Sequence, residues 1–274
     1  MIGVLPIESH ENFIAGNDMI HMVSVESYTQ GIKVDEQRLK IMEGAKRIVA
    51  VSPHPEDMEL VAGGFLAAMA KNGSSIKLVV VSDGWKGSKT LGETELAQIR
   101  RKEQGDAARI LGVGNLQFLG FEDTCVPEAG ELMGPIISEI RGFTPDLVVT
   151  VDPYLPYESH PDHVYTGRAV LQAVLLHDYP HIGGGVIKGP APPVALAATA
   201  KPNVVINIDN FIEDKMAALR CHGSQFSEES TLNFVRAVYS AVGRGIGCSY
   251  AEPFKLLYQH ELHLTYSQTR RAGT

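Results

Sequence analysis

The sequence predicts a three-layer α/β fold, in which helices cover both faces of a mostly parallel β-sheet. Two observations support this prediction. Short apolar runs alternate with helical stretches between residues 46 and 177, an order typical of α/β proteins. The apolar runs contain few polar residues, as strands that are buried on both faces do.

The first elements show the alternation most clearly. Residues 46–52 (KRIVAVS) form an apolar run that ends at Pro53, which predicts a buried strand. Residues 57–71 have helical spacing, and the following Asn72-Gly73 pair is a stop signal. Residues 76–82 (IKLVVVS) form a second apolar run, closed by Asp83-Gly84.

The same order continues along the chain. Residues 93–111 have the pattern of an amphipathic helix that ends at Gly112. Further strands are expected at 115–119 and 146–151, and further helices at 131–142 and 162–177. After residue 180 a Gly/Pro-rich excursion precedes a strand at 203–208 and helices near 210–221 and 228–242.

The domain organisation is predicted to be simple. No stretch has the composition of an interdomain linker, so we expect one domain over residues 1–274. Residues 1–44 precede the first strand as an N-terminal lead whose structure the pattern does not specify.

Composition excludes several classes of partner. The chain has 274 residues and a formal net charge of −8, which disfavours nucleic acids and anionic membranes as partners. Its three scattered cysteines predict neither a disulfide framework nor a thiolate zinc site. The apolar stretch 186–208 is interrupted by lysines and prolines, and residues 1–32 lack the basic start of a secretory signal. We therefore expect a cytoplasmic protein.

Two loops at the carboxyl ends of predicted strands, where such sheets bind ligands, carry unusual residues. After the first strand, His54 is followed by the carboxylates of Glu56, Asp57 and Glu59. Crowded carboxylates disfavour one another's ionisation unless a cation or hydrogen-bond donors neutralise them. The N-terminus of the following helix could supply that compensation, so capping is an alternative to a metal site.

The loop after the fourth predicted strand contains two histidines beside an aspartate: His160, Asp162 and His163. It too could cap a helix. Together, however, the two loops bring three histidines and several carboxylates to one edge of the sheet. Two histidines and a carboxylate are a frequent ligand set for catalytic Zn²⁺, with one coordination position left for water. The sequence therefore predicts a zinc site.

These loops resemble the motifs of the LmbE/PIG-L family of zinc-dependent N-deacetylases. The segment His54 to Glu59 resembles the family's His-Pro-Asp-Asp-x-Glu motif, and the segment His160 to His163 matches its His-Pro-Asp-His motif. The phrases IRRKEQ and DPYLPYESHPDH are most similar to the diacetylchitobiose deacetylase branch. The resemblance implies an LmbE-like fold, which is a Rossmann-like three-layer sandwich.

The resemblance also implies a role for each motif residue. It places the zinc ligands at His54, Asp57 and His163, and the general base for a metal-activated water at Glu56. It assigns His160 to the histidine that assists the tetrahedral intermediate. The family normally has Asp where this chain has Glu56, and about 1 Å of misplacement can cost on the order of 100-fold in rate.

Four further positions are candidates with a structural alternative each. Asp162 could orient a catalytic histidine or cap a helix. Arg100 could contact sugar hydroxyls, as the resemblance suggests, or form a helix-surface ion pair with Glu103. Asp123 could bind a sugar hydroxyl or cap a turn, and Tyr157 could stack on a sugar ring or pack its loop.

The predicted function is hydrolysis of the N-acetyl group of an N-acetylglucosamine-type amino sugar, for example diacetylchitobiose. The alternatives are an amidase for a related glycoside-linked thiol conjugate and a sugar-binding homologue weakened by the Glu56 change. The branch resemblance implies a homo-oligomer. His260 and His263 could reach a neighbour's active site or lie at a surface, and His222 is expected to pack its loop through hydrogen bonds.

Overall fold

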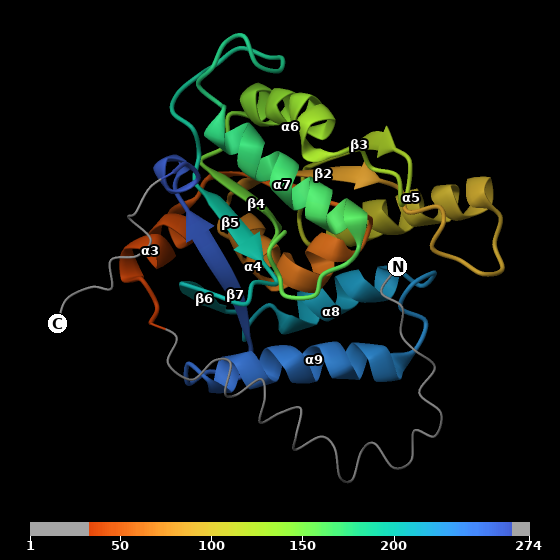
Figure 1. The fold of residues 1–274 in the computed structure, drawn as a ribbon. Coiled ribbons are helices and arrows are strands. Elements are labelled where there is room, and N and C mark those ends of the chain that lie inside the picture. The colour runs from red at the N-terminus through yellow and green to blue at the C-terminus, as the bar shows by residue number, and fades with distance from the viewer. Residues whose placement is uncertain (1–32, 265–274) are drawn as a thin grey trace.

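The computed structural model describes residues 33–264 and places a seven-stranded sheet between two layers of helices (Figure 1). The strands are β1 (Arg47–Ser52), β2 (Ser75–Ser82), β3 (Asn115–Phe121), β4 (Leu147–Val151), β5 (Val194–Ala197), β6 (Val204–Asn207) and β7 (Ala251–Leu257). Their order in the sheet is β3-β2-β1-β4-β5-β7-β6. Strands β1 to β5 pair in parallel, whereas β7 is antiparallel to β5 and to β6. The predicted mostly parallel α/β fold is confirmed.

Helices bury both faces of the sheet. The longer helices are α4 (Asp57–Lys71), α5 (Glu93–Ile110), α6 (Ala129–Phe143), α7 (Pro161–Leu175), α8 (Ile212–Cys221) and α9 (Glu229–Arg244). Along β1, Val49 and Val51 belong to the core beneath α6 and α7, while Ile48 and Ala50 belong to the core beneath α4, α8 and α9 (Figure 1). Since successive strand residues point to opposite faces, a strand covered on both sides must be apolar throughout.

The predicted elements between residues 46 and 242 are all present, with ends that differ by no more than two residues. Two strands were not predicted. β5 (VALA) lies within the Ala/Pro-rich stretch 190–200, whose composition obscures so short a strand, and β7 contains Glu252 and Pro253, which are unfavourable in an inner strand. Within β7, only Phe254–Leu257 pair with β5, so Pro253 has a strand partner only in β6.

The predicted N-terminal lead is structured in part. Its residues 1–32 lie outside the described part of the chain. The remainder forms helix α3 (Glu36–Gly44), whose N-cap residue Asp35 accepts hydrogen bonds from the backbone N–H groups of Gln37 and Arg38. A short 3-10 helix, η2 (Gln259–Glu261), follows β7.

A buried ion pair fixes helix α4 against its neighbours. Lys215 Nζ on α8 lies 2.6 Å from Glu252 Oε1 on β7, and both side chains are fully buried. The Glu252 carboxylate also accepts hydrogen bonds from the backbone N–H groups of Gly64 and Phe65 in the middle of α4. Lys215 packs so closely on α4 that a Cβ atom at Gly63 would lie 3.2 Å from Lys215 Cγ. These contacts set the position of the helix that begins with Asp57.

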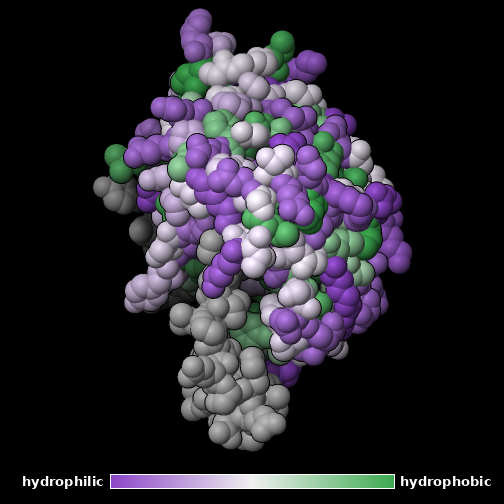
Figure 2. Space-filling model, turned by 90° about the vertical axis from the view of Figure 1, so that its right-hand side faces the viewer, coloured by the Kyte–Doolittle hydropathy of each residue, from purple (hydrophilic) through white to green (hydrophobic). Residues whose placement is uncertain are grey.

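Figure 2 shows a face on which hydrophilic side chains predominate and hydrophobic ones are scattered. Within residues 33–264, none of the helices combines the length and the apolar composition that a membrane crossing demands.

Candidate active site

The candidate site lies where β1 and β4 end side by side. These two strands pair in parallel, so the loops that follow them emerge at the same edge of the sheet. The loop after β1 carries His54 and leads into Asp57 at the start of α4, and the loop after β4 leads to His160 and His163 at the start of α7. The structure therefore brings the two sequence motifs together.

Asp57 lies between two histidines. Its Oδ2 atom is 3.3 Å from His54 Nδ1 and 3.5 Å from His163 Nε2. Two ligand atoms on a tetrahedral zinc ion with ordinary bond lengths are about 3.3 Å apart, so both distances suit shared coordination. Although burial opposes its ionisation, His163 and His54 hold the pKa of Asp57 well below its usual range. This set of two nitrogens and one carboxylate oxygen fits Zn²⁺.

His160 is close to the same point. Its ring centroid lies 4.8 Å from that of His54 and 4.6 Å from that of His163, and ligand nitrogens of all three histidines lie within 4.8 Å of one another. Its Nδ1 atom is buried and has no hydrogen-bond partner within residues 33–264. Burial and the neighbouring His54 and His163 lower the pKa of His160 to about 4. The His160 ring thus lies beside His54 and His163, and its Nδ1 atom has no hydrogen-bond partner among the described residues.

The far side of the His54 ring is held by two carboxylates. His54 Nε2 lies 2.9 Å from Asp162 Oδ2 and 3.2 Å from Asp123 Oδ1. Burial opposes the charged form of His54, but its hydrogen bonds with Asp123, Asp162 and Asp57 raise its pKa well above the usual value. Asp162 also accepts from the backbone N–H groups of Thr124 and Val126. Its carboxylate thus joins the β3–α6 loop to His54, and it makes no capping hydrogen bond to α7.

Asp123 is nearly inaccessible, with 4% of its surface exposed. Besides His54, it accepts a 2.7 Å hydrogen bond from the backbone N–H of Lys86. Burial disfavours its charge, but these hydrogen bonds hold its pKa at about 2. The Asp123 carboxylate is therefore already paired with His54 and with the Lys86 backbone.

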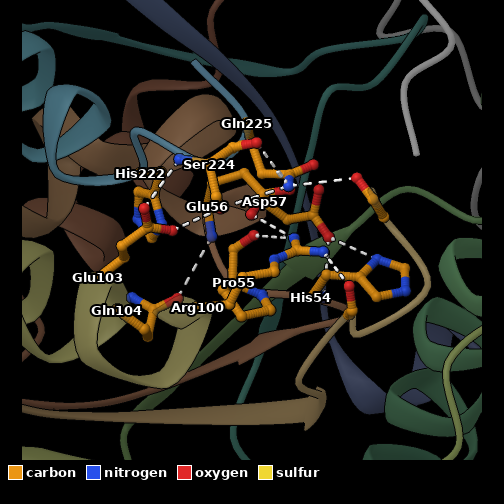
Figure 3. A network of polar contacts seen from close by, with 12 residues as sticks. His54, Pro55, Glu56, Asp57, Arg100, Glu103, Gln104, His222, Ser224 and Gln225 are labelled. Atoms are coloured by element: carbon orange, nitrogen blue, oxygen red, sulfur yellow. Dashed lines mark hydrogen bonds and ion pairs between the residues drawn. The ribbon is translucent and has the colours of Figure 1, made fainter. Parts of the chain in front are cut away.

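Glu56 has an unusual backbone conformation, with φ of +80°, and acts as the N-cap residue of α4. Its Oε2 atom lies 2.5 Å from Arg100 Nη2 (Figure 3). Burial raises the pKa of Glu56 to about 7, with Asp57 acting in the same direction and Arg100 opposing it. A carboxyl group with such a pKa can both take up and release a proton near neutral pH.

Arg100 is buried on α5 rather than exposed on the helix surface, with 2% of its surface accessible. It donates to the carbonyl oxygens of Gly84 and Pro55 as well as to Glu56. The alternative of an ion pair with Glu103 is not observed, because the Glu103 carboxylate accepts hydrogen bonds from the backbone N–H and hydroxyl of Ser224. A side chain at Gly84, where φ is +67°, would collide with the guanidinium group.

Three buried polar residues near the site were not assigned a role in catalysis or binding from the sequence. Gln104 donates a 2.6 Å hydrogen bond to Glu59, whose pKa burial raises to about 7. His222 faces Glu59 Oε2 at 3.8 Å, and neither of its ring nitrogens has a hydrogen-bond partner among the described residues. Its expected packing through side-chain hydrogen bonds is therefore not observed. The signals available in the sequence were Glu59 in the first motif and Gln104 in the phrase IRRKEQ.

The remaining candidates lie apart from these contacts. Tyr157 is fully exposed and has a positive φ of 68°, so the structure shows it neither packing its loop nor covering the site. His260 and His263 line a shallow cavity of about 370 Å³ together with Leu175, Asp178, Tyr179 and Gln259.

Comparison with known proteins places this chain among deacetylases. The family model of GlcNAc-PI de-N-acetylase (PIG-L) matches residues 49–174, a range that contains both histidine motifs. Diacetylchitobiose deacetylase from Thermococcus kodakarensis is 31% identical over 243 residues, which cover 85% of this chain and 91% of that protein.

A solved structure is similar over nearly the whole chain. N,N′-diacetylchitobiose deacetylase from Pyrococcus horikoshii, in complex with an inhibitor, superposes with a TM-score of 0.79 at 29% identity and covers 96% of this chain and 99% of its own. Mycothiol S-conjugate amidase from Streptomyces coelicolor is 30% identical over 151 residues, 46% of this chain and 51% of that protein.

Proposed function

Because the chain belongs to the GlcNAc-PI de-N-acetylase (PIG-L) family, whose members are hydrolases that act on amides, we propose that it removes the N-acetyl group from an N-acetylglucosamine-type amino sugar such as diacetylchitobiose. One observation carries the proposal. Asp57 lies 3.3 Å from His54 and 3.5 Å from His163, directly beside the partly buried Glu56. A metal-binding donor set next to an acid–base group is what hydrolysis of an amide needs.

The proposed metal is Zn²⁺, held by His54, Asp57 and His163. When bound, zinc supplies Lewis-acid chemistry that polarises an amide carbonyl and makes water a stronger nucleophile near neutral pH. The nitrogen and oxygen donors, their spacing and the buried setting support this choice.

Glu56 is the proposed general base. Its Oε2 atom is engaged by Arg100, which leaves Oε1 to take a proton from water as the water oxygen bonds to the acetyl carbon. The same carboxyl then returns the proton to the sugar nitrogen as the C–N bond breaks. The products are acetate and a free amino sugar.

His160 is proposed to donate a hydrogen bond to the acetyl oxygen as negative charge develops there. Its position beside His54 and His163 supports this role. Asp162 orients His54, and Arg100 acts on substrate through Glu56 rather than by direct contact, because its side chain is buried behind the loop (Figure 3).

The longer side chain of Glu56 is compatible with catalysis in this proposal. Arg100 reaches its carboxylate at 2.5 Å and so gives it a defined position. This contact favours an active enzyme over the sugar-binding homologue considered from the sequence. Homo-oligomer formation and a cytoplasmic location stay predictions, which the mass of the purified protein in solution and its distribution in fractionated cells would test.

The test is amide hydrolysis by zinc-loaded protein, measured as acetate released from N-acetylglucosamine and from diacetylchitobiose, and as the free amine formed from a glucosaminyl-thiol conjugate. We expect acetate from the amino sugars, with diacetylchitobiose preferred, and no release from the His163→Ala variant. Hydrolysis of the thiol conjugate alone would favour the amidase alternative. Zinc binding without hydrolysis of any of the three would contradict the proposal.

A further inference from the structure

Helix α5 turns one polar face toward the loop that carries Glu56. Arg100, Glu103 and Gln104 are spaced three and four residues apart, so they share a side of the helix. Figure 3 shows all three pointing toward the segment His54 to Asp57 and the neighbouring segment at Ser224. Arg100 binds the Glu56 carboxylate and Glu103 binds Ser224. Gln104 has a separate task, because it contacts the backbone of Glu56.

Gln104 is fully buried and uses both ends of its side-chain amide. Its Oε1 atom accepts a hydrogen bond from the backbone N–H of Glu56 at 3.3 Å, and its Nε2 atom donates to Glu59 Oε1 at 2.6 Å. The partners fix this orientation of the amide. In a flipped amide, the NH₂ group would face the backbone N–H of Glu56, and the amide oxygen would face the Glu59 carboxylate. Gln104 thus joins the loop residue Glu56 to the first turn of α4.

The backbone of Glu56 needs such support. A φ of +80° is unfavourable for a residue with a side chain, because its Cβ atom comes too close to the following carbonyl oxygen. Its N–H group also lies ahead of α4 and has no partner inside the helix. In a glutamate, rotation of the backbone at the Cα atom moves the distant carboxylate by more than it would in an aspartate. The place of the Glu56 carboxylate therefore depends on how firmly its backbone is held.

We propose that Gln104 is a positioning residue that keeps Glu56 in its left-handed conformation and so sets the place of its carboxylate. This proposal rests on the proposed function insofar as Glu56 is the general base. Arg100 holds the carboxylate directly, and Gln104 holds the main chain from which it extends. Neither the metal donors nor the sugar needs to touch Gln104 for this effect.

The first test is the Gln104→Met variant, which keeps the length and bulk of the side chain but removes the amide. The matched control is Gln98→Met, an exposed position on the same helix. We expect kcat to fall about 10- to 100-fold, with KM and zinc content unchanged, and no change in the control. In the Glu56→Ala background, Gln104→Met should lower kcat no further, because residues that act through one another are not additive.

A crystal structure gives a readout that does not depend on turnover. In Gln104→Met, the φ of Glu56 should leave the left-handed region or its carboxylate should leave Arg100. Retention of both, or a full additional loss of kcat in the Glu56→Ala background, would overturn the proposal. If wild-type protein releases no acetate at all, the proposed function fails, and the crystallographic comparison still decides the role of Gln104.

A companion variant separates positioning from folding. Gln104→Met leaves the Glu59 carboxyl without the amide donor, which could destabilise the protein. The double variant Gln104→Met/Glu59→Met removes that buried group. We expect it to regain thermal stability while kcat stays low and Glu56 stays displaced. Recovery of kcat together with stability would show that Gln104 matters only for folding and would overturn the proposal.

Discussion

His54 and Asp162 form a buried pair in which the histidine Nε2 atom lies 2.9 Å from the aspartate Oδ2 atom. The other ring nitrogen, Nδ1, faces Asp57 at 3.3 Å. When Nε2 carries its proton toward Asp162, Nδ1 has a free lone pair for a metal. We therefore expect Asp162 to fix both the orientation and the tautomer of His54, a proposed zinc ligand.

Removal of the Asp162 charge should weaken metal binding. In Asp162→Asn the shape is kept, but the nearer of the two carboxylates that hold His54 is lost, so we expect zinc affinity to fall about 10- to 100-fold. Competition with a chromophoric chelator measures this. The control is Asp178→Asn, because Asp178 pairs with His177 outside the site. Unchanged affinity in Asp162→Asn would contradict the orienting role.

The two histidines of the second motif should differ in their effects. We expect His163→Ala to lose bound zinc and turnover together, because His163 lies 3.5 Å from Asp57. His160→Ala should keep its zinc and lose about 100- to 1,000-fold in kcat, the usual effect of removing a donor to developing negative charge. Elemental analysis of dialysed protein and steady-state rates test both. The reverse pattern would assign the ligand role to His160.

Substitution of Glu56 should affect rate rather than metal content. Loss of a general base lowers kcat by about 100- to 10,000-fold, which is our expectation for Glu56→Ala. Glu56→Asp should retain intermediate activity, since a shorter side chain cannot keep its 2.5 Å contact with Arg100. The exposed Glu43→Ala serves as control. Wild-type turnover in Glu56→Ala would exclude Glu56 as the base.

Metal removal should lower thermal stability. A ligand that binds only the folded state at 100 times its Kd stabilises it by about 2.7 kcal/mol, which corresponds to a Tm shift of roughly 5–10 °C in a chain of this size. Calorimetry with and without a chelator measures the shift. His163→Ala should show little or no shift, and an equal shift in that variant would place the zinc elsewhere.

The buried Lys215–Glu252 pair should be costly to break. Lys215→Met leaves a fully buried carboxylate uncompensated, so we expect the free energy of unfolding to fall by about 3–5 kcal/mol. Arg236→Met, which breaks an exposed ion pair with Glu213, should cost about 0–1 kcal/mol. Denaturant titrations compare them. Addition of Glu252→Gln to Lys215→Met should recover part of the loss, and a further loss would contradict this account.

Sequence patterns predicted the sheet well where strands are long and buried on both faces, as in β1, β2 and β4. They missed β5 because this short strand lies within an Ala/Pro-rich stretch, and β7 because Glu252 and Pro253 are unusual in an inner strand. The charge of Glu252 is accommodated by Lys215, which lies 37 residues away in the sequence. Such long-range compensation cannot be inferred from local patterns.

The site was predictable to the level of its motifs. Parallel neighbouring strands bring His54, Asp57, His160 and His163 to one edge, and the structure places them in contact. The supporting residues were not predictable in the same way. The local helix pattern is typical of an exposed Arg100. In the structure Arg100 is buried, because Gly84 has no side chain and the turn at Glu56 leaves room for the guanidinium group.

The pairing of His54 with Asp162 spans 108 residues of sequence, and this separation has a consequence for folding. The pair is expected to form only when β1 and β4 lie side by side, and closing a loop of this length costs conformational entropy. The donor set is therefore completed only when these two strands have paired. During refolding, zinc should bind only after the native strand pairing has formed. Formation of the helices alone should leave the metal unbound.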